Sequence, residues 1–259
     1  MDFILTTKDL SVGYFENNIP KIVASKINLS CKKGNLIALI GSNGVGKSTL
    51  LRTLSGIQRP INGAVFLNGK EIGLFSKLNL AQNLSLVLTE KLPPSNLTVF
   101  ELIALGRQPY TNWIGKLTTD DLQHINQAIA LTNIEHLRDK KHFEISDGQL
   151  QIALIARALA QDTPLIVLDE PTTHLDLLHK VSLLKLLKKL SQETNKCILF
   201  SSHDVDLAIQ LADEMVVMTN NNIVQDSPCN LIEAGIFDTL FVDASIVFDR
   251  KIGKFVVNN

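Results

Sequence analysis

Residues 41–49 constrain the fold of this chain more than any other stretch. They read Gly-Ser-Asn-Gly-Val-Gly-Lys-Ser-Thr, and they stand between the wholly apolar run 36–40 and the apolar-rich segment 50–54. That order indicates a buried strand, a glycine-rich turn and the start of a helix, which is the setting in which the pattern G-x-x-x-x-G-K-[ST] binds phosphate. The stretch therefore predicts a phosphate-binding loop in an α/β protein. A glycine turn that binds nothing is the alternative.

Each residue type in the loop has a physical reason to be there. Glycines let the backbone curl so that successive N–H groups point at one anion, and the helix that follows presents its positive end. Lys47 brings a charge to the β- and γ-phosphates of a nucleotide, and Ser48 offers a hydroxyl to Mg²⁺. The residues expected to contact a nucleoside triphosphate are Gly41, Ser42, Asn43, Gly44, Val45, Gly46, Lys47, Ser48 and Thr49.

The composition excludes several other classes of protein. The 259 residues carry 25 Lys and Arg against 26 Asp and Glu, so there is no basic footprint for nucleic acid. Cys31, Cys197 and Cys229 are odd in number and far apart, which favours reduced, small hydrophobic residues over a disulfide framework. We expect no secretory signal, and no apolar run approaches the roughly 18 residues that cross a bilayer. The expected chain is soluble and cytoplasmic, and reaches a membrane only through a partner.

Outside the loop, strand patterns alternate with helix patterns. Apolar runs at 165–168 and 197–200 indicate buried strands, and leucines at helical spacing indicate a helix over about 175–191. Such alternation predicts a mostly parallel sheet that binds its ligand at the carboxyl ends of the strands. Looser alternation at 3–13 and 27–31 predicts antiparallel strands in addition.

Residues 95–158 have a different pattern, because helical spacings follow one another there with no strand between them. We expect a helical subdomain inserted between strands at 84–88 and 165–168. The ATPase domain that contains it then spans 1–235. The tail 236–259 is expected to form a small hairpin, to which no chemistry is assigned.

Polar side chains follow two buried strands at the edge where a ligand is expected. Asp169 and Glu170 come directly after 165–168, and His203 follows 197–200. A carboxylate there can hold Mg²⁺, its neighbour can accept a proton from an attacking water, and a histidine can bond to the γ-phosphate. We therefore predict Asp169 as a Mg²⁺ ligand, and Glu170 and His203 as catalytic residues. Two acids that merely end a strand and a structural histidine are the alternatives.

The order of these segments resembles the ATPase subunit of an ABC transporter. The resemblance implies a P-loop NTPase core of the RecA-like type, with an antiparallel β subdomain, an inserted helical subdomain, and ATP and Mg²⁺ as cofactors. It covers about residues 3–230. The matching segments are 41–49 (Walker A), 146–149 with the sequence Ser-Asp-Gly-Gln (signature), 165–170 (Walker B), 172–176 with the sequence Thr-Thr-His-Leu-Asp (D-loop) and His203 (H-loop).

The same resemblance implies a head-to-tail homodimer that holds two ATP molecules between its subunits. Each ATP is held by the Walker A loop of one chain and by Ser146, Gly148 and Gln149 of the other, and Asp176 crosses the interface.

An aromatic residue near the N-terminus extends the resemblance to the nucleotide base. Tyr14 matches the residue that stacks on adenine in this family, at a place where 13–15 is expected to turn out of its strand. Phe15 is an alternative stacking residue, and Tyr14 as a core aromatic is the other interpretation.

Residues 96–110 are similar to importer ATPases that serve iron-siderophore, haem and cobalamin uptake. The resemblance implies import of a metal chelate, most of all an iron-siderophore. It also implies separate transmembrane permease subunits, a substrate-binding protein acting indirectly, and a peripheral position on the cytoplasmic face of the cell membrane. The helical insert and the loop before it then receive a coupling helix from the permease.

This chain departs from the family pattern at two places. Asp147 stands where the signature has glycine, and we expect its carboxylate to face away from the γ-phosphate, because it would repel that group at close range. The family also has a glutamine after the strand at 84–88, where this chain has Thr89 followed by Glu90. We predict that Thr89 or Glu90 takes over the glutamine's contact with Mg²⁺.

Other functions remain open at this point. A soluble ABC ATPase of DNA repair or translation needs no membrane partner, although neutral charge and a single ATPase unit argue against it. Transport of a different substrate, a regulatory module that binds ATP without hydrolysing it, and a small-molecule kinase are the remaining alternatives.

Overall fold

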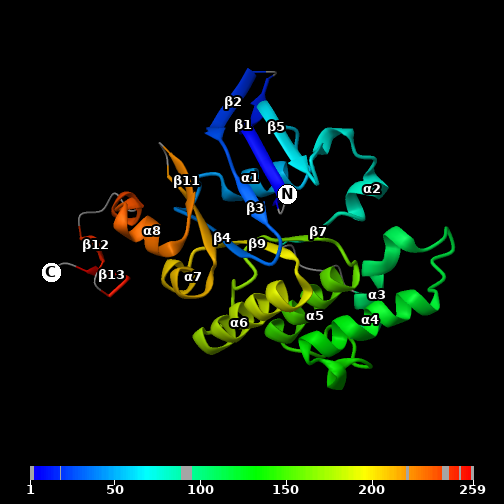
Figure 1. Ribbon diagram of the computed structural model, residues 1–259. Helices are drawn as coiled ribbons and strands as arrows, with labels where there is room; N and C mark the ends of the chain where they lie inside the picture. The colour runs from blue at the N-terminus through cyan, green and yellow to red at the C-terminus, as the bar shows by residue number, and fades with distance from the viewer. Residues whose placement is uncertain are drawn as a thin grey trace.

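The computed structural model describes residues 3–17, 19–88, 95–219, 222–240, 245–250 and 252–257. Its centre is a six-stranded sheet in the order β11-β10-β4-β9-β8-β7 (Figure 1). Strands β10, β4, β9, β8 and β7 run parallel, and β11 closes one edge as an antiparallel neighbour of β10. The strands are β4 (Leu36–Gly41), β7 (Leu84–Val87), β8 (Leu165–Leu168), β9 (Cys197–Ser202), β10 (Glu214–Met218) and β11 (Ile223–Asp226).

Strand β4 is apolar throughout because both of its faces are covered. Leu36, Ala38 and Ile40 belong to a core shared with the helices, whereas Ile37 and Leu39 belong to a core shared with the antiparallel sheet and the first helix. A strand covered on both sides reads as a continuous apolar run. The predicted parallel core is thus confirmed, and β4 lies inside it.

A second, antiparallel sheet packs on one side of the first (Figure 1). Strand β1 is longer than expected, since 13–15 does not turn outward as predicted but pairs with β2 up to Glu16. Gly13 makes this possible, because a Cβ there would lie 2.1 Å from the carbonyl oxygen of Lys21. The strands are β1 (Phe3–Glu16), β2 (Ile19–Ile27), β3 (Ser30–Lys32), β5 (Asn62–Leu67) and β6 (Lys70–Glu71).

The prediction of a single strand over 27–31 is also wrong. Strand β2 ends at Ile27 and β3 begins at Ser30. The Thr7 hydroxyl donates to the carbonyl of Ile27 and accepts from the N–H of Leu29, both at 2.8 Å. At this break, the Thr7 side chain bonds to backbone groups that a partner strand would otherwise bond. Strand alternation in the sequence does not reveal such a bond.

Most helices cover the other face of the parallel sheet, and α1 directly follows the loop after β4 (Figure 1). The helix over 175–191 corresponds to α6, whose buried side chains include Leu183, Leu184 and Leu187. The short α2 and α8 were not expected, because five or six residues show no periodicity. The α-helices are α1 (Lys47–Leu54), α2 (Lys77–Ala81), α3 (Val99–Ala104), α4 (Thr119–Thr132), α5 (Asp147–Ala160), α6 (Leu177–Thr194), α7 (Val205–Leu211) and α8 (Pro228–Glu233), and the 3₁₀ helices are η1 (Ile72–Leu74), η2 (Leu105–Tyr110), η3 (Glu135–Leu137) and η4 (Ile236–Thr239).

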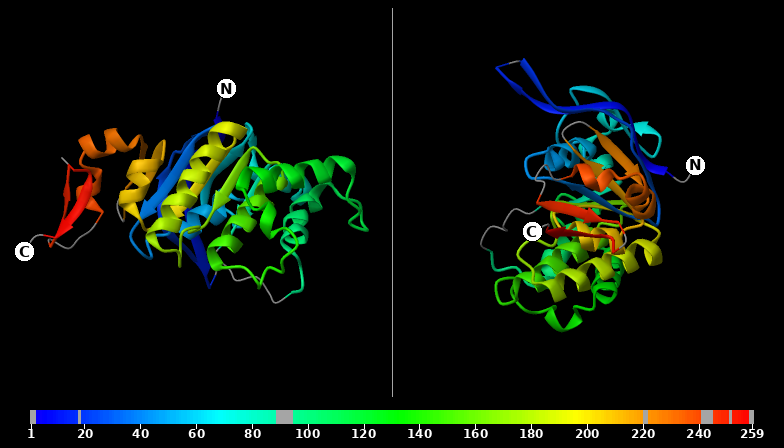
Figure 2. Two further views of the ribbon diagram at one scale, coloured as in Figure 1. Left: turned by 90° about the horizontal axis from the view of Figure 1, so that it is seen from below. Right: turned by 90° about the vertical axis from the view of Figure 1, so that its left-hand side faces the viewer.

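Helices α3, α4 and α5 follow one another between β7 and β8, and each begins with a capping box. A reciprocal pair of hydrogen bonds between the N-cap and the third residue satisfies N–H groups that have no partner inside the helix. The tail strands β12 (Ile246–Asp249) and β13 (Lys254–Val257) pair at the opposite end of the molecule from α3 and α4 (Figure 2). The division into 1–235, the insert 95–158 and the tail 236–259 stays a prediction.

Two observations concern the expected compartment. Cys31 and Cys197 are buried, whereas Cys229 is exposed, and all three are free thiols. Within the described ranges, no helix has the length and apolar character needed to span a bilayer.

Candidate functional site

The loop between β4 and α1 owes its shape to three glycines that serve different purposes. A Cβ on Gly41 would lie 2.6 Å from the Met218 carbonyl oxygen, and one on Gly46 would lie 2.3 Å from a methyl group of Val23. Gly44 and Gly46 have φ values of 77° and 111°, which residues other than glycine rarely adopt. Among the described residues, no atom outside the two neighbours of Gly44 in sequence lies within 4 Å of a Cβ built on it. The loop is therefore held from behind by β2 and β10, with open space in front of Gly44.

Lys47 is the buried cation of this loop. Its Nζ donates to the carbonyl oxygens of Gly41 at 2.8 Å and Ser42 at 3.2 Å, and it lies 3.4 Å from Nδ1 of His203. Burial lowers the pKa of Lys47 below its ordinary value, while the charges of Glu170 and Asp169 act in the opposite direction. An anion in front of the loop would stabilise this ammonium group, which is the fit that a phosphate requires.

Asp169 lies at the end of β8, where it meets two hydroxyl groups. Ser48 Oγ lies 3.5 Å from Asp169 Oδ1, and Ser201 Oγ donates to the same oxygen at 2.7 Å. Hydroxyl and carboxylate oxygens are the donor types that Mg²⁺ prefers, and Mg²⁺ bound with phosphates needs only one or two of them from protein. Among the described residues no cluster of three or more His, Cys, Asp or Glu could hold a metal by itself. The donor set thus fits Mg²⁺ shared with a nucleotide.

Glu170 is held between two partners at the same edge of the sheet. Its Oε1 contacts His203 Nε2, and its Oε2 accepts from the Thr173 hydroxyl at 3.2 Å. Its φ of 48° is unusual for a residue with a side chain, and strained backbone of this kind clusters at functional sites. Glu170, Thr173 and His203 also line an open cleft of about 420 Å³. The structure therefore brings together the predicted catalytic pair and, through His203, the loop lysine.

The predicted signature lies elsewhere on the chain. Ser146 caps α5, accepting from the Gln149 N–H at 3.3 Å and donating its own N–H to Gln149 Oε1 at 3.1 Å. A Cβ on Gly148 would make only ordinary contacts, 3.5 Å to Leu175 and 3.7 Å to His179. Within the described part of the chain, no hydrogen bond joins 146–149 to the loop 41–49. The packing of one chain therefore does not explain a glycine at 148.

Asp176 caps α6 close to the signature. Its Oδ1 accepts from the His179 N–H at 2.9 Å, and His179 Nδ1 lies 2.8 Å from both carboxylate oxygens. Asp147 at the start of α5 is exposed. The side to which Asp147 would turn in an assembled site stays a prediction.

Tyr14 is not a core residue. It lies in β1 with 45% of its surface exposed, and Lys21 Nζ lies 5.4 Å from its ring centre. Phe15 is exposed as well. Both rings are exposed, and both stay predicted candidates for stacking on a base. Thr89 and Glu90, predicted to contact Mg²⁺, lie outside the described residues.

Sequence reasoning missed Ser201. Its hydroxyl touches Asp169 and also accepts from the Glu170 N–H at 2.8 Å. The only signal was a pair of serines ending an otherwise apolar strand just before His203.

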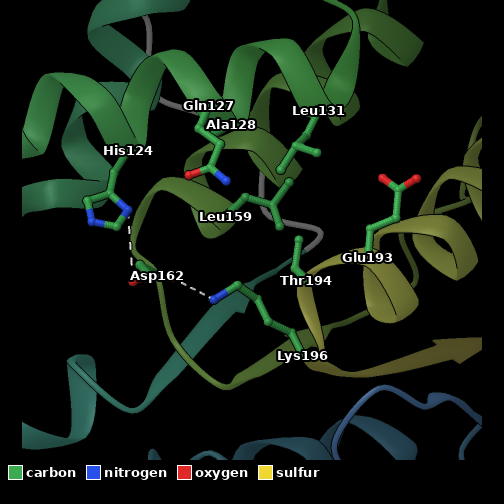
Figure 3. A pocket seen from close by; sticks show the side chains of 9 residues that line it. All are labelled: His124, Gln127, Ala128, Leu131, Leu159, Asp162, Glu193, Thr194 and Lys196. Carbon is green, nitrogen blue, oxygen red and sulfur yellow. Dashed lines mark hydrogen bonds and ion pairs between the residues drawn. The ribbon is translucent and has the colours of Figure 1, made fainter.

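A second hollow, of about 210 Å³, lies between α4 and the ends of α5 and α6 (Figure 3). Asp162 has two partners in this hollow: His124 Nδ1 lies 3.8 Å from its carboxylate, and Lys196 Nζ lies 2.7 Å from the same carboxylate. We assign no ligand to it.

Comparisons with known proteins agree with this geometry. The family model described as ABC transporter matches residues 24–173. An uncharacterised ABC transporter ATP-binding protein of Methanocaldococcus jannaschii is 40% identical over 99% of this chain and 87% of its own length. The iron(3+)-hydroxamate import ATP-binding protein of Bacillus subtilis is 36% identical over 96% of this chain and 92% of its own. A solved structure, an ABC transporter assigned to the metal-chelate type, superposes with a TM-score of 0.79 at 29% identity over 92% of this chain and 89% of its own. The fold is that of ABC ATPase subunits, with its P-loop NTPase core.

Proposed function

The chain belongs to the ABC transporter family of ATP-binding subunits, which are ATP hydrolases, and we propose that it energises the import of a metal chelate of the iron-siderophore type. Support for the substrate class comes from the iron(3+)-hydroxamate importer at 36% identity over most of both chains. The metal-chelate type transporter at 29% identity supports the same class.

The observation that carries the chemistry is the contact of Glu170 with His203 beside the buried Lys47. In the proposed reaction Lys47 stabilises the phosphate charge, Glu170 accepts a proton from the attacking water, and His203 orients Glu170 and bonds to the γ-phosphate. Ser48 and Asp169 would hold Mg²⁺, which when bound supplies positive charge to the phosphates.

We propose further that the complete site needs a second copy of the chain. Ser146, Gly148 and Gln149 form a helix N-terminus suited to an anion, but they make no hydrogen bond to the loop 41–49 within the described residues. Ser146 is exposed and Gly148 is partly exposed, so a phosphate group from outside the chain can approach this helix N-terminus. A head-to-tail homodimer would bring this segment and Asp176 to the partner's loop.

The remaining assignments follow from the role of an importer subunit. We propose that transmembrane permease subunits bind this chain at the cytoplasmic face of the cell membrane, and that a substrate-binding protein delivers the chelate to them. Purification of the tagged chain from its own cells should then yield a polytopic membrane protein. Recovery of ribosomes or DNA instead would contradict the transport assignment.

Glu170→Gln tests the catalytic assignment. The amide keeps the size of the side chain but cannot accept the proton, so steady-state hydrolysis should fall about 10²-fold or more while ATP binding persists. The variant should elute as a dimer in ATP. Glu193→Gln, a remote acid on α6, is the control and should hydrolyse ATP at the wild-type rate. Rapid turnover by Glu170→Gln would remove Glu170 from its role as base.

Uptake by whole cells tests the substrate. Deleting the gene should abolish uptake of a radiolabelled ferric siderophore, and the wild-type gene should restore it where Lys47→Ala does not. Loss of haem or cobalamin uptake in place of siderophore uptake would correct the substrate. If uptake of all three chelates survived the deletion, metal-chelate import would be wrong.

A further inference from the structure

The hydroxyl of Ser201 bonds to both the predicted Mg²⁺ ligand Asp169 and the predicted catalytic residue Glu170. Ser201 is fully buried, and Asp169 is nearly so. Ser201 Oγ lies 2.7 Å from Asp169 Oδ1 and 2.8 Å from the Glu170 nitrogen. No other described side chain forms a hydrogen bond with both acids.

The direction of these two bonds follows from their chemistry. The Glu170 N–H can only donate, so Ser201 Oγ must accept from it. The hydroxyl of Ser201 therefore donates its single hydrogen bond to Asp169 Oδ1. Because the serine cannot turn without breaking both bonds, the carboxylate of Asp169 has one preferred orientation.

Strand β9 makes the serine a rigid anchor. Ser201 is paired with Leu39 of β4, so its backbone is fixed next to the strand that leads into the phosphate-binding loop. On the other side, pairing of β9 with β8 ends at Leu168 and Phe200. Beyond that pair, the Ser201 hydroxyl accepts from the N–H of Glu170, which lies two residues after the end of β8 and has a φ of 48°. A side-chain bond thus holds a strained peptide in place, as such conformations require.

We propose that Ser201 is a positioning residue for ATP hydrolysis, which sets the orientation of Asp169 toward Mg²⁺ and the backbone conformation of Glu170. This inference rests on the proposed function, because it assigns Asp169 to the metal and Glu170 to water activation. Side chains that orient a metal ligand typically change metal affinity or activity by about 10–100-fold when removed.

Two measurements on Ser201→Ala test the proposal without relying on turnover. The first is the affinity for a non-hydrolysable ATP analogue, measured by calorimetry at increasing Mg²⁺ concentrations. The Mg²⁺ concentration that gives half of the Mg²⁺-induced increase in affinity should be about 10-fold higher than in the wild type. Amide hydrogen exchange at Glu170 should become about tenfold faster, since its N–H loses its acceptor. Ser201→Thr keeps the hydroxyl and should restore both values. Ser201→Cys, with a weak donor and acceptor of similar size, should resemble alanine.

Ser202→Ala is the matched control. Ser202 is equally buried at the end of the same strand, but its hydroxyl accepts from the Asp204 N–H at 3.0 Å. Its loss should leave the Mg²⁺ requirement within twofold of wild type. If Ser201→Ala does not fold, Ser201→Cys decides by the same two measurements.

The outcomes separate the two levels of inference. If the wild-type chain showed no Mg²⁺-dependent ATP hydrolysis, the proposed function would fail first. If the wild type hydrolysed ATP but Ser201→Ala and Ser201→Cys kept the wild-type Mg²⁺ requirement and Glu170 exchange rate, the role of Ser201 would be wrong. An equal shift in Ser202→Ala would overturn the assignment to Ser201, because Ser202 bonds to the Asp204 N–H instead of to the two acids.

Discussion

Replacing Arg107 with alanine should destabilise the fold more than any surface substitution. Arg107 and Asp121 are 3% and 2% exposed, and Arg107 Nε lies 2.8 Å from Asp121 Oδ1. The guanidinium also donates to the Ala160 carbonyl at 2.9 Å and lies 4.0 Å from the ring centre of Tyr110. One side chain therefore ties η2 to the start of α4 and the end of α5.

The magnitude follows from what the substitution leaves behind. Without Arg107, the donors that the described residues still offer to the buried Asp121 carboxylate are the Thr118 N–H and hydroxyl, and the Ala160 carbonyl at the end of α5 loses the guanidinium donor. Breaking a buried pair by removing one partner costs about 3–5 kcal/mol. The free energy of unfolding of a whole domain is only about 5–15 kcal/mol. At about 2–4 °C per kcal/mol for a chain of this size, the melting temperature should fall by about 6–20 °C.

Thermal unfolding followed by circular dichroism measures the difference in melting temperature between wild type and Arg107→Ala, at pH 7 and in acid. Burial alone would raise the pKa of Asp121, but hydrogen bonds from Thr118 and Arg107 hold it below its ordinary value of 3.8. A carboxylate whose pKa is lower when folded contributes stability above pH 3.8, and that contribution is lost as the pH falls through the folded value. The difference in melting temperature between wild type and Arg107→Ala should therefore become smaller below pH 3.8. A variant that melts within 2 °C of wild type at pH 7, or a difference that grows in acid, would refute the reasoning.

Three further predictions concern the nucleotide site. Gly46→Ala places a methyl group 2.3 Å from Val23 at a φ of 111°, so ATP affinity should fall at least about tenfold in an equilibrium binding assay, and wild-type affinity would show that the loop adapts freely. Asp147→Gly should leave ATP turnover of the assembled transporter within a few-fold of wild type, since we expect the carboxylate to face away from the γ-phosphate; a many-fold increase would show that it interferes. The double variant Thr89→Ala, Glu90→Ala should lose transport-coupled hydrolysis measured in proteoliposomes, and normal coupling would exclude both residues from the Mg²⁺ contact.

The parallel core was predictable from sequence because burial on both faces leaves only apolar side chains in β8, in residues 36–40 of β4 and in residues 197–200 of β9. Polar residues immediately after such strands then mark the ligand edge, which is why Asp169, Glu170 and His203 could be named and why they meet in space. The glycines of the loop were predictable for a similar reason, since few other functions require that spacing together with lysine.

The antiparallel region was less predictable because side chains and single close contacts decide it. The outward turn expected at 13–15 did not occur, since Gly13 allows β2 to approach closely and prolong β1. The break after Ile27 depends on one threonine hydroxyl 20 residues away in sequence. Ser201 was missed for the same reason: its significance lies in the two groups that its hydroxyl touches, and periodicity carries no information about them.

The position of Lys47 links ligand binding to the stability of the whole chain. Lys47 is a buried residue in the first turn of α1, and burial lowers the pKa of its ammonium group, which the positive end of the helix also disfavours. A bound polyphosphate removes that penalty only in the folded state, so binding and folding become thermodynamically linked. At about 100 times the dissociation constant, a nucleotide adds about 2.7 kcal/mol to the free energy of unfolding. The melting temperature of this protein should therefore report nucleotide concentration, and cellular energy depletion would shorten its lifetime as well as stop its transport cycle.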